Sequence, residues 1–92
     1  GPWGQQFPEP SFSGNFLIVQ QRIVGENHLK LSLAPQDQPD QVIDAIWFNI
    51  DTAEWPNPAL TDVSCVFKLD INEFRGMEKV QLLIKHMQPL SK

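Results

Sequence analysis

The chain alternates between hydrophobic and polar positions in several short runs, a pattern typical of β-strands with one face in a core. The clearest run is VSCVFKLDI at 63–71, where apolar residues recur at every second position. HLKLSL at 28–33 has the same period and turns His28 and Lys30 to the face opposite its leucines. Further runs rich in Val, Ile, Leu and Phe occupy 16–24, 42–50 and 80–87. The pattern therefore predicts five strands.

The run VIDAIWFNI at 42–50 alternates less cleanly than the others. We expect Ile46, Phe48 and Ile50 on its core face, because three large apolar residues share that face. Trp47 then lies on the opposite face, where it can be exposed or can pack beneath another segment.

Turn-forming residues separate these runs. Gly25 begins a turn after the first run, and residues 51–60 can hold at most one helical turn, capped by Asp51 or Thr52 and ended before Pro56. NEFRGMEK at 72–79 predicts a hairpin loop in which Gly76 supplies a left-handed backbone conformation. The last run then returns as the fifth strand.

Five strands with a weak helical turn between the third and fourth match the element order of an OB-fold, an all-β, five-stranded Greek-key barrel. Another small all-β barrel and an α+β domain are the alternatives. The opening GPWGQQFPEPSF is too rich in proline for a central strand. We therefore expect an extended connector over 1–15, a barrel over 16–88 and a tail over 89–92.

The charge of the chain is unevenly distributed. Its 92 residues have a formal net charge of −4, which argues against nucleic acid as a partner. Residues 31–67 contain acidic side chains and no Lys or Arg, so every basic residue lies before or after that span. A basic face can therefore form if folding brings the two ends of the chain together.

Cys65 lies on the apolar face of its run and is expected to be a buried small hydrophobe rather than a reactive thiol. A lone cysteine fits a reducing compartment. No apolar run approaches the ~20 residues that span a bilayer, and no signal peptide is visible. These features predict a cytoplasmic protein without membrane contact.

Several blocks of the sequence resemble one family in order and spacing: GPWGQQFPEPSF, RIVGENHLKL, DAIWFN and LDINEFRGMEKVQLLI are similar to the C-terminal region of bacterial RecJ proteins, most closely the proteobacterial ones. These are single-strand-specific 5′-to-3′ exonucleases of the DHH phosphoesterase superfamily. The resemblance extends from Gly1 to about Met87. It implies that the chain is the OB-type domain of a longer enzyme and that the opening segment enters it from the preceding domain.

The resemblance also implies where catalysis takes place. RecJ proteins hold divalent manganese or magnesium with Asp and His ligands in motifs that include Asp-His-His, and no such motif occurs here. His28, His86 and Cys65 have no zinc-ligand spacing. We expect no catalytic residue, no metal site and no cofactor in this chain.

Single-strand grooves combine cations that follow the phosphates with aromatic surfaces on which bases stack. For each candidate a solvated or structural role is the alternative, and Phe74 can instead fold back to close the barrel end. The candidate nucleic-acid-binding residues are Arg22, His28, Lys30, Trp47, Lys68, Phe74, Arg75, Lys79 and Lys85.

Two functions follow as expectations. The first is noncatalytic binding of single-stranded DNA in recombination and repair, which guides the strand to the nuclease core. The second is docking, either on the DHH catalytic core of the same chain or on the single-stranded-DNA-binding protein. Trp3, Phe7 and Phe12 of the connector are expected to pack on the barrel or on the neighbouring domain.

Overall fold

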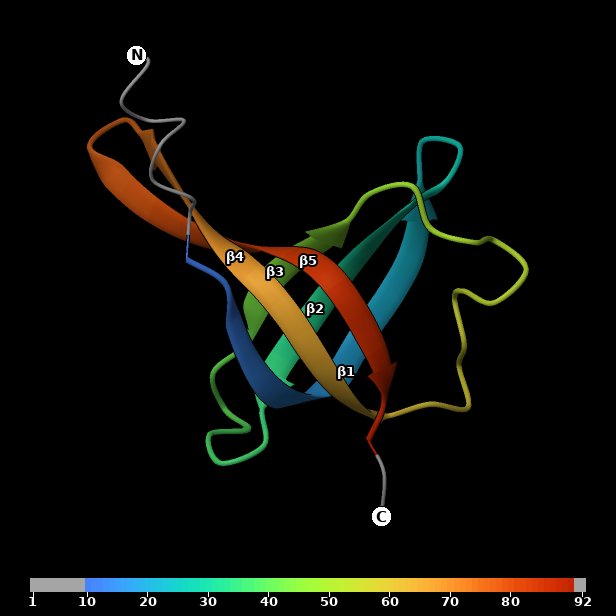
Figure 1. Cartoon of the computed structure of the whole chain (residues 1–92). Coiled ribbons are helices and arrows are strands. Elements are labelled where there is room, and N and C mark those ends of the chain that lie inside the picture. Colours follow the sequence, from blue (N-terminus) through green and yellow to red (C-terminus); the bar gives the residue numbers. More distant parts are fainter. Residues whose placement is uncertain (1–9, 91–92) are drawn as a thin grey trace.

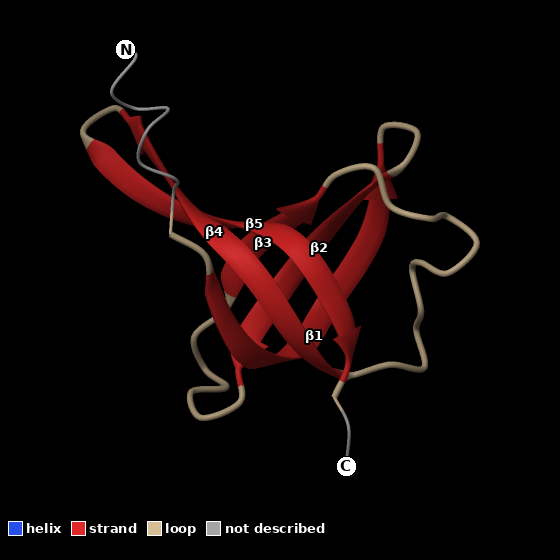
Figure 2. Cartoon of the chain, in the orientation of Figure 1, coloured by secondary structure: helices blue, strands red, loops and turns tan. Residues whose placement is uncertain are grey.

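The computed structural model describes residues 10–90, and all regular structure in that range is β-strand (Figures 1 and 2). The all-β prediction is confirmed. No helix that could cross a membrane is present between residues 10 and 90. The strands are β1 (Phe12–Val24), β2 (His28–Pro35), β3 (Ile43–Trp47), β4 (Asp62–Phe74) and β5 (Met77–Pro89).

The five strands form a closed barrel in the order β1-β2-β3-β5-β4. Neighbours are antiparallel except β3 and β5, which run parallel and pair only over Asp44–Ile46 and Gln81–Leu83. Long β4 and β5 cross the front of the barrel in Figure 1, with β2 and β3 behind them. This order is that of the OB-fold, which confirms the predicted architecture.

The leucines of β2 lie at the centre of the core. Leu29, Leu31 and Leu33 are completely or almost completely buried, as their alternation predicts. Burying a leucine side chain contributes about 1.5–3 kcal/mol relative to leaving it exposed. The other strands add apolar side chains that close the core around them, including Phe16, Ala45, Val63, Cys65, Phe67, Leu82, Ile84 and Met87.

The faces of β3 are opposite to those predicted. Ala45 is fully buried, and Trp47 pairs with the buried Leu29 and packs against the core. Phe48 is exposed because the strand ends one residue before it, and Ile50 reaches the core from the following loop. The expectation of an outward Trp47 is therefore wrong, since the alternation was extended past the end of the strand.

The β4–β5 hairpin is longer than predicted. Arg75 and Gly76 form its whole turn, with φ of 53° and 78°, and Phe74 pairs directly with Met77. Positive φ at both central positions is typical of a type I′ turn, whose twist matches that of the flanking strands. The residues expected in a loop therefore extend the ladder, and the hairpin projects beyond the barrel (Figure 1).

The loop between β3 and β4 contains a single hydrogen-bonded turn at the position where a helical turn was predicted, and no helix. The N–H of Trp55 donates to the carbonyl of Asp51, and the Asp51 side chain accepts from the N–H of Ala53 at 2.9 Å. Gln21 on β1 fixes the loop further along, since its side chain donates to the carbonyl of Asn57 at 2.7 Å and accepts from its N–H at 3.0 Å.

The first strand begins earlier than expected, at Phe12 rather than residue 16. Residues 12–15 were predicted to be connector, but they pair with β4, and the Phe12 ring stacks on Phe67 with centroids 6.0 Å apart. Phe12 thus contacts the barrel through this ring pair and remains partly exposed. Trp3 and Phe7 lie outside the described residues, and the division into connector, barrel and tail stays a prediction.

Candidate nucleic-acid interface

Strand pairing places three of the candidate cations in one row across the outside of the barrel. Arg22 on β1 pairs with Lys30 on β2, and Lys30 pairs with Ile46 on β3. The row continues through Leu83 on β5 to Lys68 on β4. Strands lie about 4.8 Å apart, so Arg22 and Lys30 are direct neighbours, while Lys68 is three strands, about 14 Å, from Lys30.

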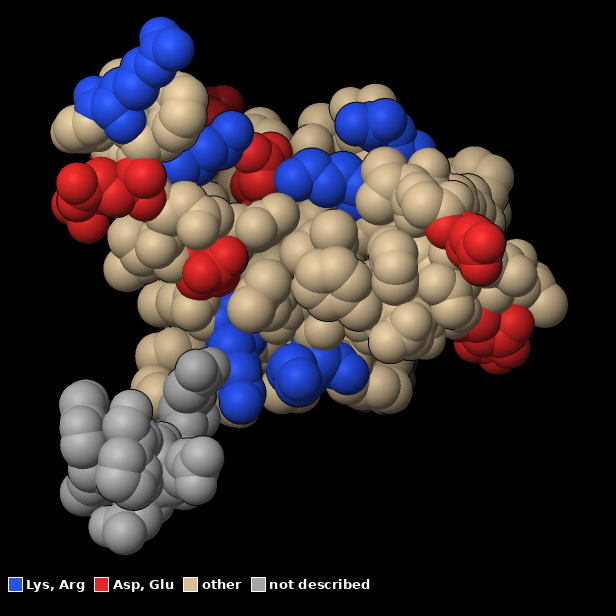
Figure 3. Space-filling model, turned by 90° about the horizontal axis from the view of Figure 1, so that it is seen from above, with Lys and Arg blue, Asp and Glu red and all other residues tan. Residues whose placement is uncertain are grey.

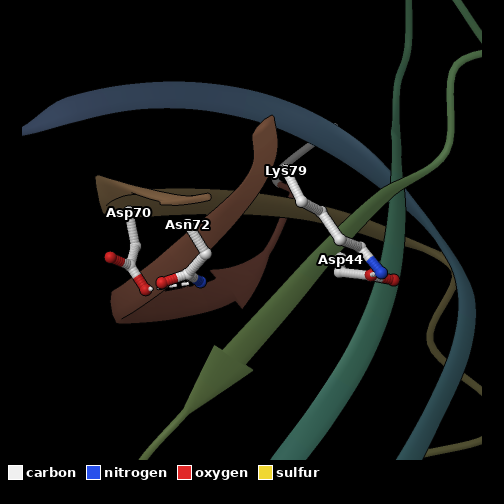
Figure 4. A network of polar contacts seen from close by, with 4 residues as sticks. All are labelled: Asp44, Asp70, Asn72 and Lys79. Carbon is white, nitrogen blue, oxygen red and sulfur yellow. Dashed lines mark hydrogen bonds and ion pairs between the residues drawn. The ribbon is translucent and has the colours of Figure 1, made fainter. Parts of the chain in front are cut away.

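The neighbouring row contains a carboxylate that contacts the hairpin. Asp44 on β3 pairs with Ser32 and Gln81, and its Oδ2 lies 2.9 Å from Nζ of Lys79 on β5 (Figure 4). The hydrogen bond from Lys79 is the main cause of a lowered pKa of Asp44; partial burial opposes it, and the charges of Lys79 and Lys30 lower it further. Asp44 thus stays ionised between two lysines.

Four cations therefore border the same side of the barrel and the hairpin: Arg22, Lys30, Lys79 and Arg75, called here the basic edge. In the view from above, basic side chains are spread along one edge of the molecule, and two more groups of basic atoms lie on the opposite edge (Figure 3). A hollow of about 320 Å³ lies on this side and includes Arg22, Lys30, Ser32 and Asp44 in its lining. Folding thus brings cations from both ends of the sequence together, as the charge distribution allowed.

The hairpin tip presents an aromatic ring and a cation to solvent. Phe74 is 70% exposed and Met77 is 74% exposed. The Arg75 guanidinium carbon lies 5.2 Å from the centroid of the Phe74 ring. Phe74 therefore does not close the barrel end, which removes the structural alternative considered for it. Its ring is available for stacking at the end of the basic edge.

The remaining cations of the predicted set lie apart from the basic edge. Lys85 occupies a β-bulge, because Val66 pairs with His86 and Phe67 with Ile84, which leaves Lys85 without a partner strand residue. Lys68 lies on β4, at the other end of the row that contains Arg22 and Lys30, and it has interactions of its own. The structure does not gather Lys68 and Lys85 with Arg22 and Lys30.

Two predicted site residues have structural contacts instead. Trp47 makes an edge-to-face contact with the buried Trp55, with centroids 5.6 Å apart. His28 accepts the N–H of Asn49 at Nδ1, at 3.1 Å, and its ring meets Phe48 edge-to-face. Neither ring lies open on the basic edge, so the aromatic contribution there comes from Phe74.

Asp44 is the residue at this site that sequence reasoning missed. It was counted only as one member of the acidic span, yet it lies between Lys30 and Lys79 on the basic edge. Its alternation with Ile43 and Ala45 indicates an outward side chain, but the proximity of Lys79 depends on the parallel pairing of β3 with β5. No local pattern in the sequence predicts that pairing.

Cys65 is buried, and burial raises the pKa of its thiol to about 12. The residue is therefore a core side chain, as predicted. Among residues 10–90, no three His, Cys, Asp or Glu side chains are grouped so that they could hold a metal ion.

Comparison with known proteins places the chain in a family. The RecJ OB domain family model matches residues 1–86. The single-stranded-DNA-specific exonucleases RecJ of Dickeya dadantii and Escherichia coli are 52% and 49% identical to it over 90 residues, and that of Haemophilus influenzae is 46% identical over 92 residues. Each alignment covers 98% of this chain but only 15–16% of the relative.

A solved structure agrees in fold. The crystal structure of RecJ in complex with Mg²⁺ from Thermus thermophilus matches with a TM-score of 0.63 at 16% identity, over 92% of this chain and 12% of that one. The predicted resemblance is confirmed by the family match and by the identity of the relatives over nearly the full chain. This chain belongs to the RecJ OB domain family.

Proposed function

We propose that this chain is the noncatalytic single-stranded-DNA-binding domain of a RecJ-like 5′-to-3′ exonuclease, and that it guides the strand to the DHH nuclease core. The observation that carries the proposal is the basic edge, which ends at the exposed Phe74 ring. In this proposal the divalent manganese or magnesium belongs to the nuclease core, and the domain acts without a cofactor.

The arrangement supports weak binding with little sequence preference. Cations placed on neighbouring strands can follow the phosphates, and stacking on an aromatic ring contributes about 1–3 kcal/mol per base. One exposed ring at the tip therefore holds about one base. Asp44 reduces the attraction for phosphate, because it engages Lys79 and lies near Lys30. We expect the rest of the affinity of a full-length enzyme to come from its other domains.

The test is a fluorescence titration of the chain with labelled oligo-dT at two salt concentrations. Each phosphate contact with single-stranded DNA contributes about 0.7 to the slope of log affinity against log salt. Three or four contacts then predict a loss of about 20- to 50-fold in affinity between 50 and 200 mM salt. Absence of binding at 50 mM by the folded chain would contradict direct binding by this domain.

Substitutions locate the binding surface. The double variant Arg22→Ala/Lys30→Ala is expected to reduce the salt slope by about 1.4, because two phosphate contacts are lost. Lys85→Ala is the matched control, since it removes a positive charge from a different part of the barrel. Equal losses per charge from the two variants would show that net charge, and not the basic edge, determines binding.

A docking function is the second candidate, and the exposed apolar side chains at the hairpin tip favour it. Phe74 and Met77 are directly opposite each other and largely exposed. Such a tip can dock on the nuclease core or on the single-stranded-DNA-binding protein. Phe74→Ala/Met77→Ala in a full-length RecJ carrying this domain separates the two functions. Weakened association with either protein, with oligo-dT affinity unchanged, supports docking; loss of oligo-dT affinity supports stacking.

A further inference from the structure

Phe48 is an aromatic side chain that lies outside the core. It directly follows the end of β3, and 52% of the residue is exposed. Its ring meets the His28 ring edge-to-face, with centroids 5.1 Å apart. His28 also accepts the N–H of Asn49 at Nδ1, at 3.1 Å, which ties the residue after Phe48 to β2. The Phe48 ring therefore has a defined position although it is exposed.

The contact with His28 places the Phe48 ring beside the basic edge. Leu29 is fully buried, so His28 and Lys30 on either side of it point away from the core. Two residues along a strand correspond to about 7 Å, which is the separation of His28 from Lys30 along β2. Trp47 was predicted as the exposed ring on this surface, but it packs against the core. The exposed ring beside the cations of β1 and β2 is therefore Phe48.

The cations of β2 and β5 lie between Phe48 and the ring of Phe74 at the hairpin tip. β3 and β5 run parallel, and Ile46 pairs with Leu83. Phe48 follows that pair by two residues, Lys79 precedes it by four, and Phe74 lies two residue pairs beyond Lys79. The two rings are thus eight residues, about 27 Å, apart along the strands. In Figure 1 the β1–β2 turn, next to His28, and the hairpin tip stand on the same side of the barrel.

We propose that Phe48 is a second stacking platform for a base of single-stranded DNA, at the opposite end of the basic edge from Phe74. This role rests on the DNA-binding function proposed above and extends it. One strand is then held by an aromatic ring at each end and by cations between them, the combination that single-strand grooves use. OB-folds bind about 4–16 nucleotides, so one strand can reach both rings. Stacking tolerates any base, because every base has a π-face.

Titration of the variant Phe48→Ala with labelled oligo-dT tests this role. Loss of one stacking ring is expected to lower the affinity by about 5- to 140-fold. The slope of log affinity against log salt should stay unchanged, because no phosphate contact is lost. Phe48→Tyr keeps a ring and should bind like the wild type, whereas Phe48→Leu keeps an apolar side chain without a ring and should bind like Phe48→Ala. Val42→Ala is the matched control, since Val42 is 54% exposed and precedes the other end of β3.

The double variant Arg22→Ala/Lys30→Ala separates failure of this role from failure of DNA binding. If that variant loses affinity while Phe48→Ala binds like the wild type, stacking on Phe48 is overturned and the DNA-binding function stands. If the folded wild type binds no oligo-dT, both are overturned. A reduced salt slope for Phe48→Ala, or an equal loss for Val42→Ala, also overturns stacking. Upfield shifts of the thymine protons that the wild type causes and Phe48→Ala reduces would support it independently of affinity.

Discussion

The β4–β5 hairpin has the same alternating pattern inside the barrel and beyond it, but the two halves differ in burial. Val63, Cys65 and Phe67 are buried where β1 and the leucines of β2 lie against them. Leu69 and Ile71, next in the same alternation, stay about half exposed where β1 has ended. Alternation thus predicts which face is apolar, whereas burial depends on a second layer.

The two faces of the projecting half of the hairpin also differ from each other, in their chemistry. The inward face is apolar and carries Leu69, Ile71 and Val80. The outward face carries Lys79 and the Asp70–Asn72 contact (Figure 4), and Phe74 lies beyond them at the tip. One face suits packing and the other suits charged ligands. The two faces of one hairpin therefore expose surfaces of different chemistry.

The largest expected effect contrasts the two halves by stability. Phe67→Ala removes a buried ring that contacts Phe12 and Phe16, and is expected to cost about 3–5 kcal/mol. Met77→Ala at the exposed tip should change the free energy of unfolding by no more than about 0.5 kcal/mol. Urea denaturation followed by circular dichroism measures both. Similar costs would show that the tip is packed in solution.

Thiol reactivity distinguishes the same halves chemically. Because the pKa of Cys65 is raised from 9.0 to about 12, its thiolate fraction at pH 8 is about 1,000-fold below that of an ordinary thiol. Iodoacetamide should therefore label Cys65 slowly in the folded chain and rapidly in urea. The variant Met77→Cys adds an exposed thiol as the comparison. Comparable labelling rates at the two positions would contradict the burial of Cys65.

Substitution of Arg75 separates the effect of the hairpin turn on stability from its effect on DNA binding. A non-glycine residue with φ of 53° is strained, and Asn or Gly is favoured at this position of a type I′ turn. Arg75→Asn is expected to raise stability by about 0.5–1 kcal/mol while weakening oligo-dT binding. Thermal unfolding and the DNA titration measure the two effects. A loss of stability would show that the contact between Arg75 and Phe74 outweighs the strain.

Asp44 is expected to have the smallest effect on stability. Its exposed ion pair with Lys79 contributes about 0.2–1 kcal/mol. Since its pKa is lowered from 3.8 in the folded chain, this contribution is present above pH ~4 and is lost as the pH falls through the lowered value. Urea midpoints of the wild type and Asp44→Asn should differ at pH 7 and converge as the pH falls through the lowered pKa of Asp44. A constant difference would assign the effect to something other than ionisation.

Much of the barrel was predictable from local pattern, because Leu29, Leu31 and Leu33 lie in a strand that alternates to its end. Trp47 was not, because β3 ends at that residue and the apparent alternation beyond it belongs to a loop. Lys30 was predicted on the correct face, but its proximity to Lys79 depends on barrel closure. The pairing of strands that are distant in sequence thus determines which of these side chains lie close together.

The parallel seam between β3 and β5 has a consequence for dynamics. Only Asp44–Ile46 and Gln81–Leu83 pair there, while β4 and β5 share a ladder along nearly their whole length. Short ladders open more readily than long ones, so we expect amide protons at this seam to exchange with solvent before those of the hairpin. The Asp44–Lys79 ion pair crosses the same seam. A ligand that removes Lys79 from Asp44 would therefore change how often the barrel opens.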